Sequence, residues 1–321
     1  MFQQKGIKAT RIGFGEGLKL LGGKYDNVIA LGADITASVG MNLFAGAYPD
    51  RFFSFGIAEQ NIVGVSAGLA KEGFVPVFAT YGVFAAHRDY DQIRISVCYN
   101  NYKVIIGGAH AGISVGPDGA THQALEDIAA IRVLPNITLL SPCDAAQTKQ
   151  AVIAAYEQTN GPVYVRYARA AMPDFIPDDY PFEIGKAQVL KEGSDITIIA
   201  TGHLVWESLL AADNLWKQYG INAEIINLHT IKPIDKETII ASAKKTGIVL
   251  TAEEHQIVGG MGSAVAEVLA SNYPVPITFV GINDRFGESG EPLELMQKYG
   301  LTHQNIESKV LLILKNRKNN E

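Results

Sequence analysis

The stretch VPVFATYGVFAAHRDYDQIRISVCYNNYKVIIG, residues 75–107, decides the fold class. Two short apolar runs within it, Val75–Ala79 and Val104–Gly107, have the β-branched and aromatic content of strands. The intervening Tyr81–Tyr99 has the length and apolar spacing of a helix. Two strands joined by a helix in this way are expected to lie parallel in one sheet.

The same alternation of strand and helix extends in both directions along the chain. The other expected strands are Val28–Ala33, Phe52–Phe55, Ile137–Leu140, Val163–Tyr167, Ile196–Ala200, Ala223–Leu228, Ile248–Thr251 and Ile277–Val280. Further helices are expected at Ala58–Glu72 and Ala124–Arg132. The pattern predicts an α/β protein with two doubly wound domains.

One stretch interrupts this alternation. Met172–Gly185 holds three prolines and four acidic residues and has no regular apolar period, which is typical of a linker. We therefore predict a first domain at residues 1–175, a linker at 176–184 and a second domain at 185–321.

Composition narrows the class of function. The chain has 321 residues, enough for two domains with cores, and its net charge of −6 offers no basic field for nucleic acid. The first residues are too short and polar for a signal peptide, and no apolar run reaches membrane-spanning length, so we expect a cytoplasmic protein without a membrane or nucleic-acid partner. The two cysteines, Cys98 and Cys143, form no zinc or disulfide pattern.

A strand that runs into a helix places an acid at the helix start. In Phe53–Asn61 this acid is Glu59, and its plainest role is to complement the helix dipole. Gly64 and Gly68 follow in the same helix. Because glycine is a poor helix former, the pair suggests that another backbone packs closely there.

The next expected helix carries an aromatic stripe. Tyr81, Phe84 and either His87 or Arg88 recur at spacings that share one helix face. Such a stripe forms either part of a core or a wall of a ligand site. The cation disfavours a sealed core, and the stripe begins at the carboxyl end of a strand, where sheets of this class bind ligands.

A glycine-rich loop, Gly107–Gln123, holds His110, Asp118 and His122. Glycines let a loop approach a ligand closely, and histidine can move protons near neutral pH. The alternatives are a metal site and a solvated turn-rich loop. The spacing matches no established metal motif, so we assign no metal ligands to this chain.

A fourth segment, Gly161–Arg169, ends in two arginines. Arg166 and Arg169 follow an apolar strand and could bind a phosphate group in bidentate fashion. The alternative is that they form surface salt bridges.

Together these segments resemble the C-terminal half of transketolase in their order and in their residues. The resemblance covers nearly the whole chain. The residues that carry the resemblance are Asp118–Gln123, Ala124–Ala129, Leu134–Thr138, Ala252–Gln256, Gly259–Ser263 and Asp284–Gly290. The chain is most similar to the separately encoded C-terminal subunits of split transketolases. The run Arg88–Gln92 is shared with deoxyxylulose-phosphate synthases.

The resemblance implies roles for individual residues. Glu59 would activate the aminopyrimidine ring of thiamine diphosphate, and the implied cofactor contacts are Asp34, Glu59, Tyr81, Phe84 and His87. The implied sugar contacts are His110, Asp118 and His122, of which His110 and His122 would be catalytic. The implied phosphate contacts are Arg11, Ser38, Arg88 and Arg169. Ala111, Pro117 and His87 depart from common family residues, which leaves the sugar preference open.

The family binds the cofactor diphosphate and its metal through a Gly-Asp-Gly segment, which this sequence lacks. The resemblance therefore implies a second chain, an N-terminal transketolase subunit, that holds the diphosphate together with Mg²⁺ or Ca²⁺. The expected assembly is α₂β₂ with this chain as β and an obligate interface. The implied activity is transfer of a two-carbon ketol unit between a phosphorylated ketose and an aldose.

Three alternatives stay open. The β subunit of a 2-oxo-acid dehydrogenase has a similar size and fold but lacks the loop ending Asp-Gly-Ala-Thr-His-Gln and the sugar-phosphate cations. A deoxyxylulose-phosphate synthase is usually one longer chain. A non-catalytic scaffold subunit is disfavoured because Glu59, His110, Asp118 and His122 are all retained. The sequence does not specify the sugars, the pathway or the partner gene.

Overall fold

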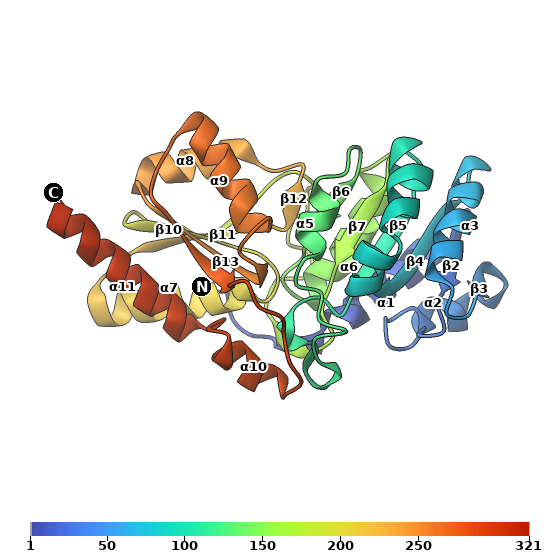
Figure 1. The fold of residues 1–321 in the computed structure, drawn as a ribbon, viewed down its shortest axis with the longest axis horizontal. Coiled ribbons are helices and arrows are strands. Elements are labelled where there is room, and N and C mark those ends of the chain that lie inside the picture. The colour runs from blue at the N-terminus through green and yellow to red at the C-terminus, as the bar shows by residue number, and fades with distance from the viewer. Residues whose placement is uncertain (1, 321) are drawn as a thin grey trace.

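The computed structural model describes residues 2–320, with side chains up to residue 317. Two sheets lie side by side along the longest axis, the larger from the first half of the chain and the smaller from the second (Figure 1). Helices lie on the faces of both sheets (Figure 1). The predicted fold class, two doubly wound α/β domains, is confirmed.

The larger sheet has the strand order β12-β6-β7-β5-β4-β2-β3. Its parallel strands are β2 (Val28–Gly32), β3 (Phe52–Ser54), β4 (Val75–Tyr81), β5 (Ile105–Ala109), β6 (Thr138–Leu140) and β7 (Val163–Arg166). The edge strand β12 (Thr230–Lys232) is antiparallel to β6 and comes from the second half of the chain. The two halves are therefore joined by backbone pairing as well as by side chains.

The smaller sheet has the order β14-β13-β10-β11-β9. Its parallel strands are β10 (Ile196–Ala200), β11 (Ala223–Asn227), β13 (Val249–Gln256) and β14 (Ile277–Ile282), and β9 (Gln188–Lys191) is antiparallel to β11. A separate ribbon pairs β1 (Gly6–Ala9) with β8 (Ala171–Asp174). All of the strands expected from apolar runs are present.

The longer helices are α1 (Thr10–Lys24), α3 (Glu59–Lys71), α6 (Ala145–Glu157), α7 (Leu204–Tyr219), α8 (Lys236–Thr246), α9 (Met261–Asn272) and α11 (His303–Asn320). Shorter elements are α2 (Asn42–Ala47), η1 (Pro49–Arg51), η4 (Ile113–Asp118), α5 (Asp127–Arg132) and α10 (Pro292–Lys298). Within the described residues, no helix is both long and apolar enough to cross a bilayer.

Apolar clusters on the two faces of the larger sheet hold these elements together. One face packs against α1 and α6, where Gly13 is required because a Cβ at this position would lie 2.0 Å from the Ala145 carbonyl oxygen. The cluster on the other face includes Ile62 of α3 and continues without a break to Met261 of α9. The core therefore crosses the boundary between the two halves.

The expected helix at Tyr81–Tyr99 is only partly correct. Tyr81 is still in β4, where it pairs with Ala109 of β5. Two π-helical segments, η2 (Phe84–Arg88) and η3 (Ile93–Tyr99), then flank a single α-helical turn, α4 (Tyr90–Gln92). Three β-branched residues in η3 have low α-helical propensity, which the spacing of apolar residues does not reveal.

The stretch expected to be an irregular linker, Met172–Gly185, begins in the regular strand β8. Directly after it, the Phe175 and Ile176 amides donate to the Asp144 carboxylate over 2.8 and 2.6 Å. Asp144 also caps α6, and burial raises its pKa to about 6. The start of this stretch is therefore anchored to the first sheet by hydrogen bonds.

Candidate active site

A cluster of four rings forms where β4 and β5 end. The Tyr81 ring lies 4.1 Å from the His110 ring and 5.4 Å from the His122 ring, and Phe84 lies 5.7 Å from His122. Tyr81 ends β4, and the two histidines lie in the loop after β5. The structure thus brings together two motifs that are separated by about one βαβ unit in the sequence, because parallel strands end at the same edge.

Two further predicted residues join this cluster from the start of the chain. The Ser38 hydroxyl lies 3.1 Å from the Tyr81 hydroxyl, and Arg11 Nη1 donates to the Ser38 carbonyl over 3.1 Å. A guanidinium has five N–H donors, so these contacts leave Arg11 able to bind an anion at the same time.

The predicted catalytic acid Glu59, the first residue of α3, lies against Arg88. Arg88 Nη1 is 3.0 Å from both Glu59 carboxylate oxygens, and its guanidinium carbon is 4.0 Å from the centre of the Phe84 ring. Glu59 is 4% exposed, whereas the Arg88 side chain is 43% exposed. A flat group with N–H donors therefore fits against both Phe84 and Glu59, and an aminopyrimidine ring has this shape and chemistry.

His110 is more enclosed than its predicted proton-transfer role requires. It is 1% exposed, and its ring nitrogens contact no hydrogen-bond partner among the described residues. Burial, together with the charges of Arg169, Arg11 and His122, lowers its pKa to about 3. The ring is therefore neutral near pH 7 in this chain, whereas an unperturbed histidine titrates close to neutral pH.

Asp118 and Arg169 form a pair at the far side of the same loop. Arg169 Nη1 lies 3.3 Å from an Asp118 oxygen and donates to the Val115 carbonyl over 2.9 Å. Both side chains are about one-third exposed. An acid that can accept from a hydroxyl and a cation that can bind an anion are thus next to each other.

The structure does not bring two predicted cofactor residues into this cluster. Asp34 is exposed with a positive φ of 64°, and no contact links its side chain to the ring cluster in the described part of the chain. His87 Nε2 lies 3.8 Å from a Glu126 carboxylate oxygen, and the interaction with this acid raises the pKa of His87. Of the two cations considered for the aromatic stripe, Arg88 contacts Phe84 and His87 does not.

The opposite shifts of the two histidines predict different titrations. The His110 ring should not titrate between pH 5 and 8, while His87 should titrate above its ordinary pKa of 6.5. Unfolding returns the pKa of His110 from about 3 to 6.5, so the unfolded chain binds more protons between these values. His110 therefore lowers the stability of the fold as the pH falls from 6.5 towards about 3. NMR of the ring carbons and nitrogens measures both midpoints.

The matched variant for this titration is Glu126→Gln, which removes the charge on the group that His87 contacts. We expect it to lower the His87 midpoint and leave His110 unchanged, since Glu126 does not contribute to the His110 shift. A His110 midpoint between pH 5 and 8 in the isolated chain would contradict the enclosed geometry.

Sequence reasoning missed Asp89, which lies beside Arg88. Asp89 is fully buried, and neither of its carboxyl oxygens has a hydrogen-bond partner among the residues the structure describes. Burial and the nearby charge of Glu59 raise its pKa to about 7. No pattern marked this residue, because it stands at the unspecified position of the Arg-x-Tyr-Asp-Gln run.

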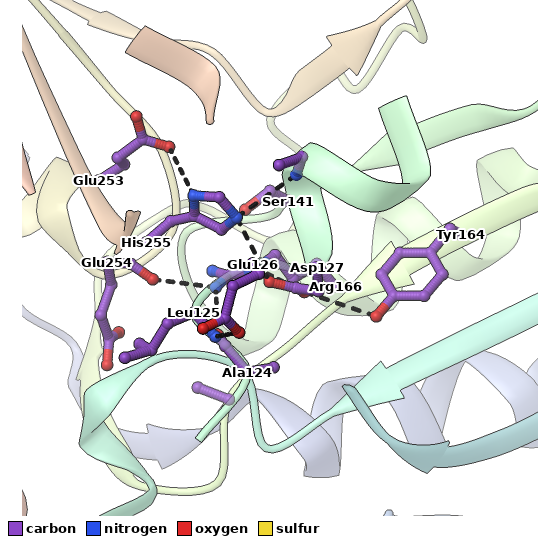
Figure 2. Close-up of polar contacts among 12 residues, drawn as sticks. Ala124, Leu125, Glu126, Asp127, Ser141, Tyr164, Arg166, Glu253, Glu254 and His255 are labelled. Carbon is purple, nitrogen blue, oxygen red and sulfur yellow. Dashed lines mark hydrogen bonds and ion pairs between the residues drawn. The ribbon is translucent and has the colours of Figure 1, made fainter. Parts of the chain in front are cut away.

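Arg166, a candidate for phosphate recognition from the sequence, lies inside the protein instead. Its Nε donates to both Asp127 oxygens over 3.1 and 2.9 Å, and Nη2 donates to the carbonyls of Ala124 and Glu254 (Figure 2). Arg166 and Asp127 are both at least 95% buried. Arg166 therefore links the two halves of the chain. It forms a salt bridge, as the alternative to phosphate binding expected, but this salt bridge is buried and not at the surface.

His255 and Glu253 complete this buried network (Figure 2). The Ala129 amide approaches His255 Nε2 at 3.4 Å, and His255 Nδ1 lies 2.7 Å from the Gln256 carbonyl, so the proton is on Nδ1. Burial lowers the pKa of His255 to about 4, and it raises that of Glu253 to about 7 although the Met261 and Gly262 amides donate to Glu253. The network is structural, since Arg166, Asp127, His255 and Glu253 are all sealed from solvent.

Comparison with known proteins gives consistent matches over both halves. The family model for the transketolase pyrimidine-binding domain matches residues 8–174, and that for the transketolase C-terminal domain matches residues 185–306. A protein of Methanocaldococcus jannaschii named "Putative transketolase C-terminal section" is 44% identical, covering 95% of this chain and 96% of that protein. The 6-deoxy-6-sulfo-D-fructose transketolase subunit SqwH of a Clostridium species is 42% identical over 88% of this chain and 87% of that subunit.

A solved structure gives the same result. A chain described as "Split gene transketolase, inactive beta4 tetramer" superposes with a TM-score of 0.89 at 46% identity. The match covers 96% of the present chain and 99% of that chain.

Proposed function

This chain belongs to the transketolase family, and from that premise we propose that it is the C-terminal (β) subunit of a two-chain, thiamine-diphosphate-dependent transketolase. The reaction would transfer a two-carbon ketol unit between a ketose and an aldose, in the cytoplasm. The observation that carries the proposal is the Glu59 carboxylate, which is buried at a helix start. The flat guanidinium of Arg88 lies against both this carboxylate and the Phe84 ring, where an aminopyrimidine ring would bind.

Within this site, the residues of the chain would bind one end of the cofactor. Thiamine diphosphate supplies the carbon nucleophile and the electron sink when it is bound. Glu59 would hold a proton at the ring nitrogen of the pyrimidine, and Phe84 would cover one ring face. Arg88 has to leave Glu59 for this contact to form, and its 43% exposure supports such a movement.

The loop after β5 and the nearby cations would bind the sugar. Asp118 would accept a hydrogen bond from a sugar hydroxyl, and His122 would contact a sugar oxygen. Neutral His110 would act there as a hydrogen-bonding group and not as a cation. Arg11 and Arg169 would bind the anionic end, which is a phosphate or, as in the name of the clostridial relative, a sulfonate.

The diphosphate and its Mg²⁺ or Ca²⁺ would be held mainly by an N-terminal partner subunit in an α₂β₂ assembly. The name "C-terminal section" and the inactive tetramer formed by a similar chain support this dependence. The exposed face of α3 supports it as well. A Cβ at Gly64 or Gly68 would meet nothing within 4 Å, and nearby Ile57 is 76% exposed, so this face can accept a closely packed backbone from another chain.

The test is a ketol-transfer assay on this chain, on an N-terminal transketolase subunit as its partner, and on both expressed together. Turnover of xylulose 5-phosphate with an aldose acceptor is expected only for the two chains together with thiamine diphosphate and Mg²⁺. Sulfofructose serves as a second donor. Decarboxylation of a 2-oxo acid in place of ketol transfer would overturn the proposal in favour of a dehydrogenase β subunit.

A variant of the exposed helix face tests the partner interface in the same assay. Gly64→Arg should leave the isolated chain folded, because a helical glycine is about 0.5–1 kcal/mol less favourable than an ordinary residue and the new side chain meets open space. It should nevertheless abolish co-purification and turnover. The control Ala241→Arg places the same side chain at an exposed position of α8 and should retain both properties. Retained co-purification of Gly64→Arg, or an equal loss in the control, would contradict an interface at α3.

A further inference from the structure

The second half of the chain holds the loop that carries His110, Asp118 and His122. The Ser114 amide, in the middle of this loop, donates to Glu254 Oε1 of β13 over 2.5 Å. Ser114 and Glu254 are both buried, at 0% and 3% exposure. A carboxylate from the second half of the chain therefore accepts a hydrogen bond from a backbone amide in a loop of the first half.

Glu254 is itself firmly placed. Its carbonyl accepts from Arg166, whose guanidinium is held by Asp127, and its second carboxylate oxygen lies 3.6 Å from His203. Figure 2 shows that Glu253 and Glu254, although adjacent on β13, turn their carboxylates to opposite sides. Glu253 caps the start of α9, and Glu254 reaches the loop.

The loop backbone is shaped to this carboxylate. Gly112 has a φ of +85°, and a Cβ there would lie 2.3 Å from the Glu254 carboxyl carbon. Only glycine combines that backbone conformation with so close an approach. The loop therefore contributes a glycine that permits the close approach, and the second half of the chain contributes the carboxylate.

The end of the loop is held by a second segment of the C-terminal half. Gln123 Nε2 donates to the Ile113 carbonyl over 3.1 Å and to the Glu288 carbonyl over 2.9 Å. A Cβ at Gly287 would lie 1.8 Å from Gln123 Oε1, so the backbone at 287 lies directly against this amide. The loop is therefore bracketed at its middle and at its end.

We propose that Glu254 is a positioning residue, and that the C-terminal half orients the sugar-binding loop through it. The inference rests on the proposed function, since it concerns the same site. A backbone amide that donates to an ionised carboxylate forms a stronger bond than one that donates to a neutral acceptor. Removing Glu254 should free the loop and leave Glu59 in place, since Glu59 lies outside the loop on α3.

The first readout is hydrogen exchange of residues 110–123 in the isolated chain, measured by mass spectrometry for Glu254→Ala and Glu254→Gln. Since loss of a charge-assisted hydrogen bond allows local opening, we expect Glu254→Ala to speed exchange of the loop by about tenfold or more. Glu254→Gln retains an acceptor oxygen of the same size and should restore part of the protection. It also serves if the alanine variant does not fold.

The second readout is steady-state kinetics of the complex with the partner subunit. Glu254→Ala should raise KM for the ketose by about tenfold with a smaller change in kcat, because sugar binding and not cofactor activation is altered. The dissociation constant for thiamine diphosphate should stay the same. The matched control is Glu253→Gln, which changes the adjacent buried carboxylate on the same strand but makes no contact with the loop.

Unchanged exchange of the loop in both Glu254 variants would overturn the inference, as would an equal rise in KM for Glu253→Gln. The exchange readout does not depend on catalysis. If the wild-type complex transfers no ketol unit, the proposed function fails, and hydrogen exchange still decides whether Glu254 holds the loop.

Discussion

Replacement of Glu59 by alanine is expected to lower kcat of the assembled enzyme by about 10²- to 10⁴-fold, the range typical of a lost proton-transfer group. The carboxylate is 4% exposed at the start of α3 and lies against the Arg88 guanidinium. Steady-state kinetics at saturating thiamine diphosphate and Mg²⁺ measure the effect.

Two companion variants separate catalysis from folding. Glu59→Gln keeps the size of the side chain but cannot hold a proton in the same way, and we expect nearly the same loss. Glu72→Gln changes an exposed acid at the other end of α3 and should retain full activity. Undiminished turnover in the Glu59 variants would remove this residue from the mechanism.

The largest expected effect on stability comes from Asp127→Ala. It leaves the Arg166 guanidinium charged and at least 95% buried without its carboxylate, which typically costs about 3–5 kcal/mol. Because Arg166 also donates to the Glu254 carbonyl, the loss should loosen the contact between the two halves. Urea unfolding of the isolated chain, followed by circular dichroism, measures the change in unfolding free energy.

A partly exposed ion pair provides the control for this prediction. Asp213 pairs with Lys217 four residues later on α7, and the lysine side chain is 67% exposed. Asp213→Ala should cost only about 0.3–0.5 kcal/mol. The double variant Asp127→Leu/Arg166→Met should recover much of the stability lost in Asp127→Ala, since it leaves no unpaired buried charge. If Asp127→Ala costs no more than Asp213→Ala, Arg166 finds another partner or water.

Much of the fold was predictable because its strands are marked locally. Val163–Tyr167 was expected as a strand and β7 is Val163–Arg166, since a run of β-branched and aromatic residues favours the extended backbone wherever it lies. The pairing partners were not predictable in the same way. Thr230–Lys232 crosses from the second half of the chain to the edge of the first sheet, and no local pattern specifies which edge a short strand will join.

The same division applies to the candidate site. The sequence by itself determined which chemical groups are available: an acid at a helix start, an aromatic stripe, a glycine-rich loop with two histidines and an aspartate, and several arginines. Only the tertiary structure decided which charges meet. Arg88 lies on Glu59, His87 on Glu126, and Arg166 in the interior with Asp127.

The physical reason is that charge and burial act through space. The pKa of His110 falls to about 3 because the folded chain encloses the ring and brings Arg169 and Arg11 near it, although these arginines are far away in the sequence. Hydrophobic period and helix capping act within a few residues and can be read along the chain. Other features depend on distances that exist only after folding. These are the ion pairs, the burial of His110 and the hydrogen bond between Glu254 and the distant Ser114 amide.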